Sequence, residues 1–218
     1  MVNIEKSGLV GTGHHRECYR HPEDSNLCIK IAVSGNSKAI KREKKYYRRL
    51  EKRGVSWDLI PRYFGEIETN MGSGSVFDLV FDHDGAISKN LKHYLSSNEL
   101  TEENYRRLSN ALDLLKNYLL QQRIITMTLN PNNILCKKQA SGSLRLYVID
   151  NIGNSVLIPI CNISDYFAKK KILRKWKRFE GKRLRKYKHN SALHKILTNT
   201  HALEGLTGSI LPKTCSNK

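Results

Sequence analysis

The first third of the chain alternates apolar and polar positions, which is the pattern of half-buried β-strands. Turn signals at Gly11, Gly13 and Pro22 divide residues 8–33 into short pieces. The last piece carries aliphatic side chains on one face (Leu27, Ile29, Ile31 and Val33). This part of the chain is therefore expected to begin with an antiparallel sheet.

A change to helical spacing follows. The segment Lys38–Lys52 reads as a helix that Gly54 ends, and its apolar positions recur every three or four residues. Two further strands are expected over Tyr63–Thr69 and Ser75–Phe81, closed by a turn at Asp84-Gly85.

Beyond that turn the pattern becomes mainly helical. Thr101 is expected to cap a helix whose apolar stripe consists of leucines (Leu108, Leu112, Leu115 and Leu119). Thr128–Ile134 reads as a loop, and two short strands are expected at 134–137 and 144–150. Residues after Tyr166 again favour helix.

This order predicts an α+β protein with two lobes. A β-rich lobe with one helix is expected over about residues 1–85, and a short helical lobe over about 86–204. Together they make a single domain, and residues 205–218 are expected to form a flexible tail.

Positive charge is concentrated in two segments. Lys38–Arg53 contains nine Lys and Arg against two Glu, and Tyr166–Asn190 contains twelve against one Glu. These segments account for the net charge of +18, which favours an anionic partner such as an acidic protein, a nucleic acid or lipid phosphate. The alternative is a pair of solvated helix faces on a protein without such a partner.

The remaining composition limits the class of protein. No apolar run approaches the eighteen or so residues of a transmembrane helix, and the start lacks the apolar core of a signal peptide, so a cytoplasmic protein is expected. The five cysteines are widely spaced and contain no C-x-x-C pair, which favours reduced thiols over disulfides or a zinc site.

Gly11 and Gly13 lie in a turn between two predicted strands. Glycines at such a turn let backbone N–H groups approach a phosphate. A plain β-hairpin is the more common reason for such a G-x-G turn, and Arg16 stands where the kinase glycine-loop pattern has its third glycine.

Lys30 lies within an otherwise apolar strand and shares its face with the small side chains Cys28 and Ala32. Glu43 falls on the apolar, inward face of the following helix, together with Tyr47. Because a buried carboxylate needs a partner, an ion pair between Lys30 and Glu43 is predicted, as in kinases, where this pair positions the lysine against ATP phosphates. A snorkelling edge-strand lysine is the alternative.

The loop Thr128–Ile134 resembles the end of a kinase catalytic loop. Asn133 falls five residues after Thr128, at the spacing of a magnesium-binding asparagine, and Asp150 ends a strand seventeen residues later. Asp150 is followed by Asn151-Ile152-Gly153, which is similar to the D-F-G motif with one extra residue. Asn133 and Asp150 are therefore the predicted metal ligands.

The chain resembles the bacterial YrbL family over about residues 8–180. The resemblance implies a protein-kinase-like fold and an association with the PhoP regulatory network. It is carried by Gly11-Thr12-Gly13-His14-His15-Arg16-Glu17-Cys18-Tyr19, His21-Pro22-Glu23-Asp24, Cys28-Ile29-Lys30-Ile31, Ile60-Pro61-Arg62-Tyr63, Thr126-Met127-Thr128-Leu129-Asn130-Pro131, Asn133-Ile134-Leu135-Cys136 and Asp150-Asn151-Ile152-Gly153.

One departure from active kinases decides the functional expectation. Thr128 stands at the position of the catalytic aspartate, and a hydroxyl cannot serve as the general base at neutral pH. A protein that binds ATP and Mg²⁺ and acts as a regulatory or pseudokinase module is expected. An active small-molecule or lipopolysaccharide-type kinase, and a nucleotide-independent binder of anionic nucleic acid or lipid, remain as alternatives.

Overall fold

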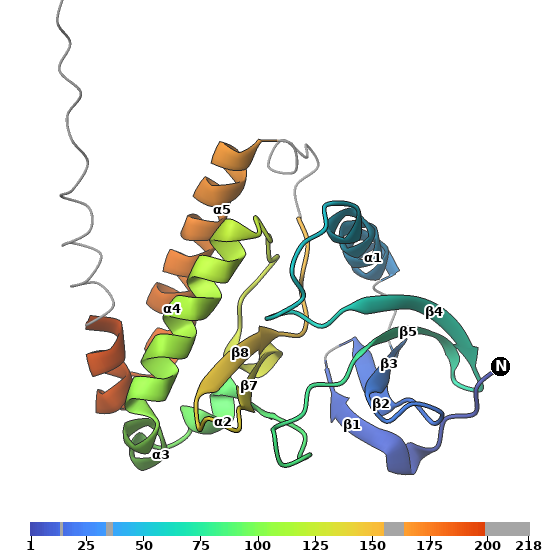
Figure 1. Ribbon diagram of the computed structural model, residues 1–218, viewed down its shortest axis with the longest axis horizontal. Coiled ribbons are helices and arrows are strands. Elements are labelled where there is room, and N and C mark those ends of the chain that lie inside the picture. The colour runs from blue at the N-terminus through green and yellow to red at the C-terminus, as the bar shows by residue number, and fades with distance from the viewer. Residues whose placement is uncertain (14, 34–36, 155–163, 199–218) are drawn as a thin grey trace, which may run out of the picture.

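The computed structural model describes residues 1–13, 15–33, 37–154 and 164–198. A five-stranded antiparallel sheet forms from the first 78 residues, and most of the helical residues come afterwards (Figure 1). The mixed α+β class expected from the sequence is thereby confirmed.

The large sheet has the strand order β1-β2-β3-β5-β4. It follows a short 3₁₀ turn, η1 (Lys6–Gly8). Its strands are β1 (Leu9–Thr12), β2 (Arg16–Arg20), β3 (Leu27–Ala32), β4 (Tyr63–Thr69) and β5 (Gly72–Asp78). All four pairs of neighbouring strands are antiparallel, as hairpin connections require.

Strand β5 lies earlier in the chain than the sequence pattern predicts. The expected strand was Ser75–Phe81, whereas β5 begins at Gly72. A tight connection explains the shift, because Gly72 has a φ of 104° and pairs directly with Thr69 across the β4–β5 hairpin. At Gly74 a Cβ atom would lie 2.3 Å from Cγ2 of Ile29, so glycine is required there for packing.

The two faces of this sheet have different roles. On one face the buried side chains form a small separate core (Ile4, Tyr19, Ile29, Ile31 and Val76). The opposite face carries Cys28 and Phe77, which belong to the main core and lie under helix α1. Alternation along β3 therefore divides its aliphatic residues from the side chains that face α1.

Helix α1 (Ser37–Lys52) lies over one face of the sheet (Figure 1). Its extent agrees with the predicted helix, and Tyr47 and Leu50 are buried on its inward side as expected. The Tyr47 ring meets Phe77 edge-on with centroids 5.3 Å apart, which fixes the helix to β5.

A second, three-stranded sheet has the order β6-β7-β8. Figure 1 shows the β7–β8 pair between the large sheet and helix α4, against which β8 packs. The elements of this part are β6 (Lys89–Asn90), α2 (Leu91–Tyr94), α3 (Asn98–Glu103), α4 (Tyr105–Gln121), the 3₁₀ turn η2 (Pro131–Asn133), β7 (Ile134–Lys138) and β8 (Leu144–Val148).

The basic segment is helical, as predicted. It contains α5 (Asp165–Arg178), one π-helical turn η4 (Phe179–Arg183) and the 3₁₀ turn η5 (Leu184–Tyr187), and residues 191–198 are again helical. Helix α5 packs along α4, with Ile172 and Trp176 buried between them. The predicted flexible tail over residues 205–218 lies outside the described residues.

Thr101 does not cap the long helix, which corrects the sequence prediction. It lies inside α3, where Ser97 is the cap, and α4 starts after Asn104. The Thr101 hydroxyl is fully buried, donates to the Tyr94 carbonyl at 2.7 Å and accepts from Nδ2 of Asn190 at 2.7 Å. The acidic residues after Thr101 resemble a capping box. The Thr101 hydroxyl nevertheless does not cap a helix, because it is buried against Asn190 and is used in the hydrogen bonds to Tyr94 and Asn190.

Candidate functional site

Strand register brings several polar side chains to one face of the large sheet. Cys18 of β2 lies opposite Lys30 of β3, and Arg16 lies opposite Ala32. Residues directly opposite one another point to the same side of a sheet. Arg16, Cys18 and Lys30 therefore all point towards helix α1 and the segment that follows β8.

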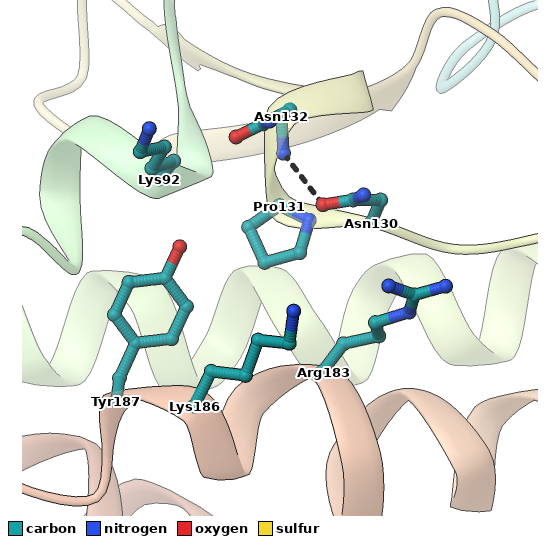
Figure 2. Close-up of a pocket in the computed structure, with 7 residues that line it drawn as sticks. All are labelled: Lys92, Asn130, Pro131, Asn132, Arg183, Lys186 and Tyr187. Carbon is teal, nitrogen blue, oxygen red and sulfur yellow. Dashed lines mark hydrogen bonds between the residues drawn. The ribbon is translucent and has the colours of Figure 1, made fainter.

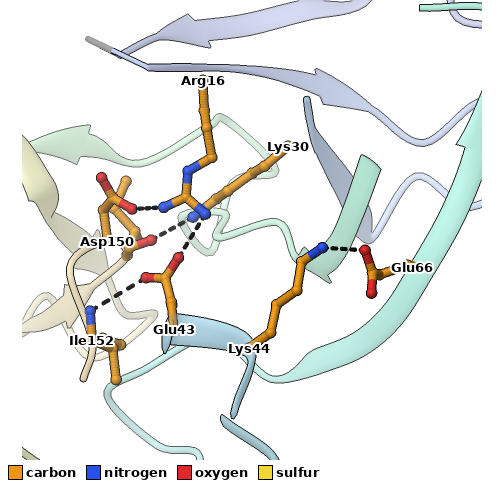
Figure 3. A network of polar contacts seen from close by, with 8 residues as sticks. Arg16, Lys30, Glu43, Lys44, Glu66, Asp150 and Ile152 are labelled. Atoms are coloured by element: carbon orange, nitrogen blue, oxygen red, sulfur yellow. Dashed lines mark hydrogen bonds and ion pairs between the residues drawn. The ribbon is translucent and has the colours of Figure 1, made fainter. Parts of the chain in front are cut away.

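Arg16 joins two carboxylates that come from different parts of the chain. One guanidinium nitrogen lies 2.6 Å from Oε2 of Glu43, and the other pairs with Oδ1 of Asp150 (Figure 3). The remaining carboxylate oxygen of Glu43 accepts a hydrogen bond from the Ile152 amide at 3.3 Å. Strand β2, helix α1 and the segment after β8 thus meet at one arginine.

The structure corrects the predicted partner of Glu43. Glu43 is 3% exposed, so its predicted inward orientation is confirmed, but its ion-pair partner is Arg16. Lys30 instead donates to the Ile149 carbonyl, and its Nζ lies 4.5 Å from the centre of the Phe77 ring. The longer reach and forked shape of a guanidinium let it bridge Glu43 and Asp150 together, which a single ammonium group does less well.

Lys30 is a half-buried cation. Burial is the main cause that lowers its pKa, the neighbouring Arg16 charge lowers it further, and the Glu43 carboxylate partly offsets both. In the described part of the chain no carboxylate lies within ion-pairing distance of Lys30. A half-buried ammonium that donates to a neutral carbonyl has no bound carboxylate to displace before it pairs with an added anion.

The sequence did not predict the role of Arg16. Its position was noted only as the substitution of a third glycine. A signal was nevertheless present, because Arg16 and Cys18 alternate along β2 and must lie on one face, the face that also receives Lys30. What could not be read from the sequence was the approach of Asp150 from a position 134 residues away.

The two segments that resemble kinase motifs lie side by side. Thr126 and Ile152 form an antiparallel bridge, and the Met127 amide donates to the Asn151 carbonyl at 2.7 Å. Asn151 has a φ of 61°, so the residue inserted before Gly153 is accommodated in the left-handed region that asparagine tolerates.

Asn133 and Thr128 flank this junction. The Asn133 carbonyl accepts from the Ile149 amide at 3.0 Å, which places Asn133 beside the residue that precedes Asp150. The side chains of Asn133 and Thr128 are both half-buried. The structure therefore brings the two predicted metal ligands, Asn133 and Asp150, to the same edge of the β7–β8 pair.

Gly11 and Gly13 border the cluster from β1. The Gly13 amide donates to the Arg16 carbonyl at 2.7 Å and closes the turn between β1 and β2. Gly11 lies opposite Cys18, and a Cβ atom added at Gly11 would meet no atom within 4 Å. The absence of a side chain at Gly11 thus leaves room on the face that carries Cys18 and Lys30.

Cys18 and Cys28 interact next to Lys30. A hydrogen bond with the Cys28 thiol is the main cause that lowers the pKa of Cys18 to about 7, with burial opposing it and Lys30 and Arg16 assisting it. The same hydrogen bond and burial raise the pKa of Cys28 well above its ordinary value. Cys18 is therefore the thiolate former of the pair.

The acidic groups can contribute to a magnesium site only in part. Among the described residues, no group of three or more His, Cys, Asp or Glu side chains is arranged to hold a metal ion. Magnesium is commonly held by one or two protein carboxylates together with substrate phosphates and water. The oxygens of Asp150 and Asn133 fit that kind of ligand set.

This fold and site define an α+β protein with a buried cluster of charges between its large sheet and its helical part. The chain belongs to the family described as PhoP regulatory network protein YrbL, whose model matches residues 2–184. It is similar to the proteins described as "Uncharacterized protein YrbL" in Escherichia coli (strain K12) and Shigella flexneri. Each is 42% identical over 182 residues, which covers 82% of this chain and 86% of the relative.

The membership confirms the family that the sequence motifs indicated. It also confirms the PhoP regulatory network as the family's description. Within the described ranges, no helix combines the length and the apolar character needed to cross a membrane.

Proposed function

We propose that this protein binds Mg-ATP in a kinase-like site between the large sheet and the helical part, and acts as a regulatory or pseudokinase module in a PhoP-type network. The single observation that carries the proposal is the convergence of Lys30, Glu43 and Asp150 from β3, α1 and the end of β8. The same order of strand lysine, helix glutamate and late aspartate positions ATP in kinases.

Charge balance supports a magnesium-bound ligand. Arg16 and Lys30 bring two positive charges, and Glu43 and Asp150 bring two negative charges. A nucleotide triphosphate adds negative charge, which a divalent cation would offset on binding Asp150 and Asn133. Arg16 would then be free to leave Asp150 and pair with phosphate oxygens, for which a guanidinium is a strong bidentate partner.

The nucleotide base has a matching surface on the same face of the sheet. Lys30 is flanked there by Cys28 and faces Cys18, whose side chains are small, and Gly11 leaves open space beside them. Val10 and Cys18 are partly buried and pack against the main core. An apolar surface of small side chains beside a lysine that binds phosphate would accommodate the flat base of a nucleotide.

Phosphoryl transfer is expected to be slow. Thr128 holds the place of the catalytic base, and its hydroxyl can only donate or accept a hydrogen bond at neutral pH. Mg²⁺ would supply charge stabilisation to the phosphates when bound, and positioning of this kind still allows weak transfer. An active small-molecule or lipopolysaccharide-type kinase remains the enzymatic alternative.

Calorimetric titration with ATP, with and without Mg²⁺, tests the proposal. Saturable Mg-dependent binding is expected, and a hundredfold excess over Kd should add about 2.7 kcal/mol of stability, or about 5–10 °C in Tm. Lys30→Ala and Asp150→Asn should each remove most of the effect.

Lys44→Ala provides the matched control. Lys44 is another lysine between α1 and the sheet, but it pairs with Glu66 away from the cluster (Figure 3). Its variant should bind as wild type. If millimolar Mg-ATP neither binds nor stabilises the folded wild-type protein, the nucleotide proposal is wrong.

A nucleotide-independent function receives support from helix α5. Tyr166, Phe167 and Leu173 are 65%, 47% and 46% exposed, unusual values for such large apolar groups. They lie on the helix side that also carries lysines and arginines (Lys169, Lys170, Arg174 and Lys177). Basic and aromatic side chains on one helix face suit an anionic lipid surface.

A further inference from the structure

Apart from the candidate nucleotide site, the helical part carries a positively charged pocket. It has a volume of about 180 Å³, space for several water molecules, and lies between α2, η2 and the end of the basic segment. Its lining consists of Lys92, Asn130, Pro131, Asn132, Arg183, Lys186 and Tyr187. Three of these seven side chains are cationic and none is acidic.

Figure 2 shows how the lining side chains face one another. Arg183, Lys186 and Tyr187 rise from one wall towards the turn Asn130–Asn132, and Lys92 lies beside that turn, above Tyr187 in this view. Within the described residues, none of the three cations has a carboxylate at ion-pairing distance. Three like charges around one hollow repel each other, and an anion that enters relieves the repulsion.

The walls are fixed by the core. Lys92 follows Leu91, which is 1% exposed, and Leu184 next to Arg183 is also 1% exposed. Pro131 is buried and starts η2, whose cap is closed by the Asn130 side chain accepting from the Asn132 amide at 3.3 Å. The cations are thus carried on backbone that the core holds in place, which reduces the cost of organising them around a ligand.

The chemistry of the lining favours a phosphate group. Arg and Lys supply charged donors, and the two asparagine amides and the Tyr187 hydroxyl can supply neutral ones. Partial burial raises the pKa of Tyr187, so its hydroxyl keeps its proton at neutral pH. A phosphate monoester near pH 7 carries between one and two negative charges and three acceptor oxygens, which matches this set of donors.

We propose that the pocket formed by Lys92, Asn130, Asn132, Arg183, Lys186 and Tyr187 binds the phosphate group of a small phosphorylated ligand. The pocket shares the loop Thr128–Ile134 with the candidate nucleotide site, but it lies around the turn that precedes Asn133. Binding there requires neither Lys30 nor Asp150. A phosphorylated ligand held at this turn lies beside the loop that carries Thr128.

Calorimetric titration of the full chain at fixed ionic strength tests this site, with inorganic phosphate and with glycerol 3-phosphate as separate probes. One saturable site is expected for at least one of the two probes. If the ligand is a small organic phosphate, glycerol 3-phosphate should bind more tightly than inorganic phosphate. If the ligand is the free anion, inorganic phosphate should bind more tightly. Arg183→Gln and Lys186→Gln should each weaken binding by about tenfold or more, the effect of losing one charged hydrogen bond.

Two controls separate the pocket from general charge and from the nucleotide site. Arg185→Gln removes the same charge from the same turn, but Arg185 is exposed and outside the lining, so this variant should bind as wild type. Lys30→Ala should also retain phosphate binding. Equal weakening by Arg185→Gln, loss of binding in Lys30→Ala, or no saturable binding in wild type would each overturn the proposal, whether or not Mg-ATP binds elsewhere.

Discussion

At the scale of single residues, Cys18 has a thiol whose pKa is lowered by its neighbours to about 7. Its thiol lies between Cys28 and two cations on the face that carries Lys30. The hydrogen bond from Cys28 favours the Cys18 thiolate, because a charged acceptor strengthens that bond. Because the thiolate is reactive, the rate at which Cys18 is alkylated should show whether a ligand covers the sheet face that carries Lys30.

Alkylation by iodoacetamide should therefore follow the titration of Cys18. A pKa of about 7, below the ordinary 9.0, means that the rate rises as pH increases through 7 and levels off about one unit above. An unperturbed thiol would still gain reactivity beyond pH 8. Mass spectrometry identifies the labelled residue, with Cys18→Ser as the control.

Mg-ATP should slow this labelling if the base lies against Cys18. Cys28 and Cys136 should stay unlabelled, because the hydrogen bond with Cys18 together with burial raises the pKa of the Cys28 thiol, and burial raises the pKa of the Cys136 thiol. Labelling of Cys18 that is equally fast with saturating Mg-ATP would argue against the predicted position of the base.

Thr128 is the second residue whose chemistry can be tested alone. Thr128→Ala should leave Mg-ATP affinity unchanged, because a side chain at the base position acts on the acceptor and not on the nucleotide. Radiolabelled phosphate transfer by the wild type should be far slower than the roughly 1–100 per second of active kinases.

Turnover at ordinary kinase rates in the wild type would contradict the pseudokinase interpretation. Another group would then have to act in place of the missing carboxylate. A return of activity in Thr128→Asp would show that the remaining parts hold Mg-ATP in a productive geometry.

At the scale of elements, one buried hydrogen-bond network joins the segment that contains the helical residues 191–198 to the middle of the chain. Asn190 donates to the Thr101 hydroxyl and to the Ser97 carbonyl at 3.1 Å, and accepts from the Leu193 amide at 3.0 Å. Residues 191–198 are thereby attached to α3 by hydrogen bonds between buried side chains.

Thr101→Val should lower the free energy of unfolding by about 1–3 kcal/mol, because the isosteric methyl leaves the Tyr94 carbonyl and the Asn190 amide without the hydroxyl. Denaturant titration measures the loss. Thr198→Val is the matched control, since the Thr198 hydroxyl donates to the His194 carbonyl on the exposed side of the last helix. A similar loss in both variants would contradict the role of the buried network.

Elements with strong local patterns could be predicted from the sequence, and elements set by distant contacts could not. Helix α1 and strand β4 were read correctly because their apolar periodicity is regular. Strand β5 was misplaced because its first residues, Gly72-Ser73-Gly74, have weak strand propensity and form a strand through pairing with β4.

The same distinction applies to the candidate site. Burial of Glu43 follows from helical spacing, so it was predictable, whereas its pairing with Arg16 depends on how α1 sits above β2. The pocket at Asn130–Asn132 was not predicted either, since Lys92 lies far from Arg183 and Lys186 in the sequence and only the fold brings them together.

At the scale of the whole molecule, the proposed lipid contact would combine the net charge of +18 with the exposed face of α5. Binding to vesicles that contain anionic lipid should fall steeply as salt rises, because the Debye length is already about 10 Å at 0.1 M. Replacing Tyr166 and Phe167 by Ser should weaken vesicle binding at every salt concentration, measured by co-sedimentation.

Leu114→Ser is the control for that experiment. Leu114 is an apolar side chain of similar exposure, 45%, on the neighbouring helix α4. Its loss should leave binding unchanged. Salt-independent binding, or binding that survives loss of both aromatic rings, would show that α5 is not the contact surface.

Arg16, which joins β2, α1 and the segment after β8, occupies an oxygen of Asp150 that a bound metal ion would also need. In the proposed site the Arg16 guanidinium and Mg²⁺ would compete for Oδ1 of Asp150, so the site would be ready for the metal to the extent that Arg16 has released that oxygen. The measured dissociation constant is the intrinsic one divided by that ready fraction. Residue 16 would thus help to set the concentration of nucleotide at which the protein responds, first by holding Asp150 and then by pairing with the phosphate.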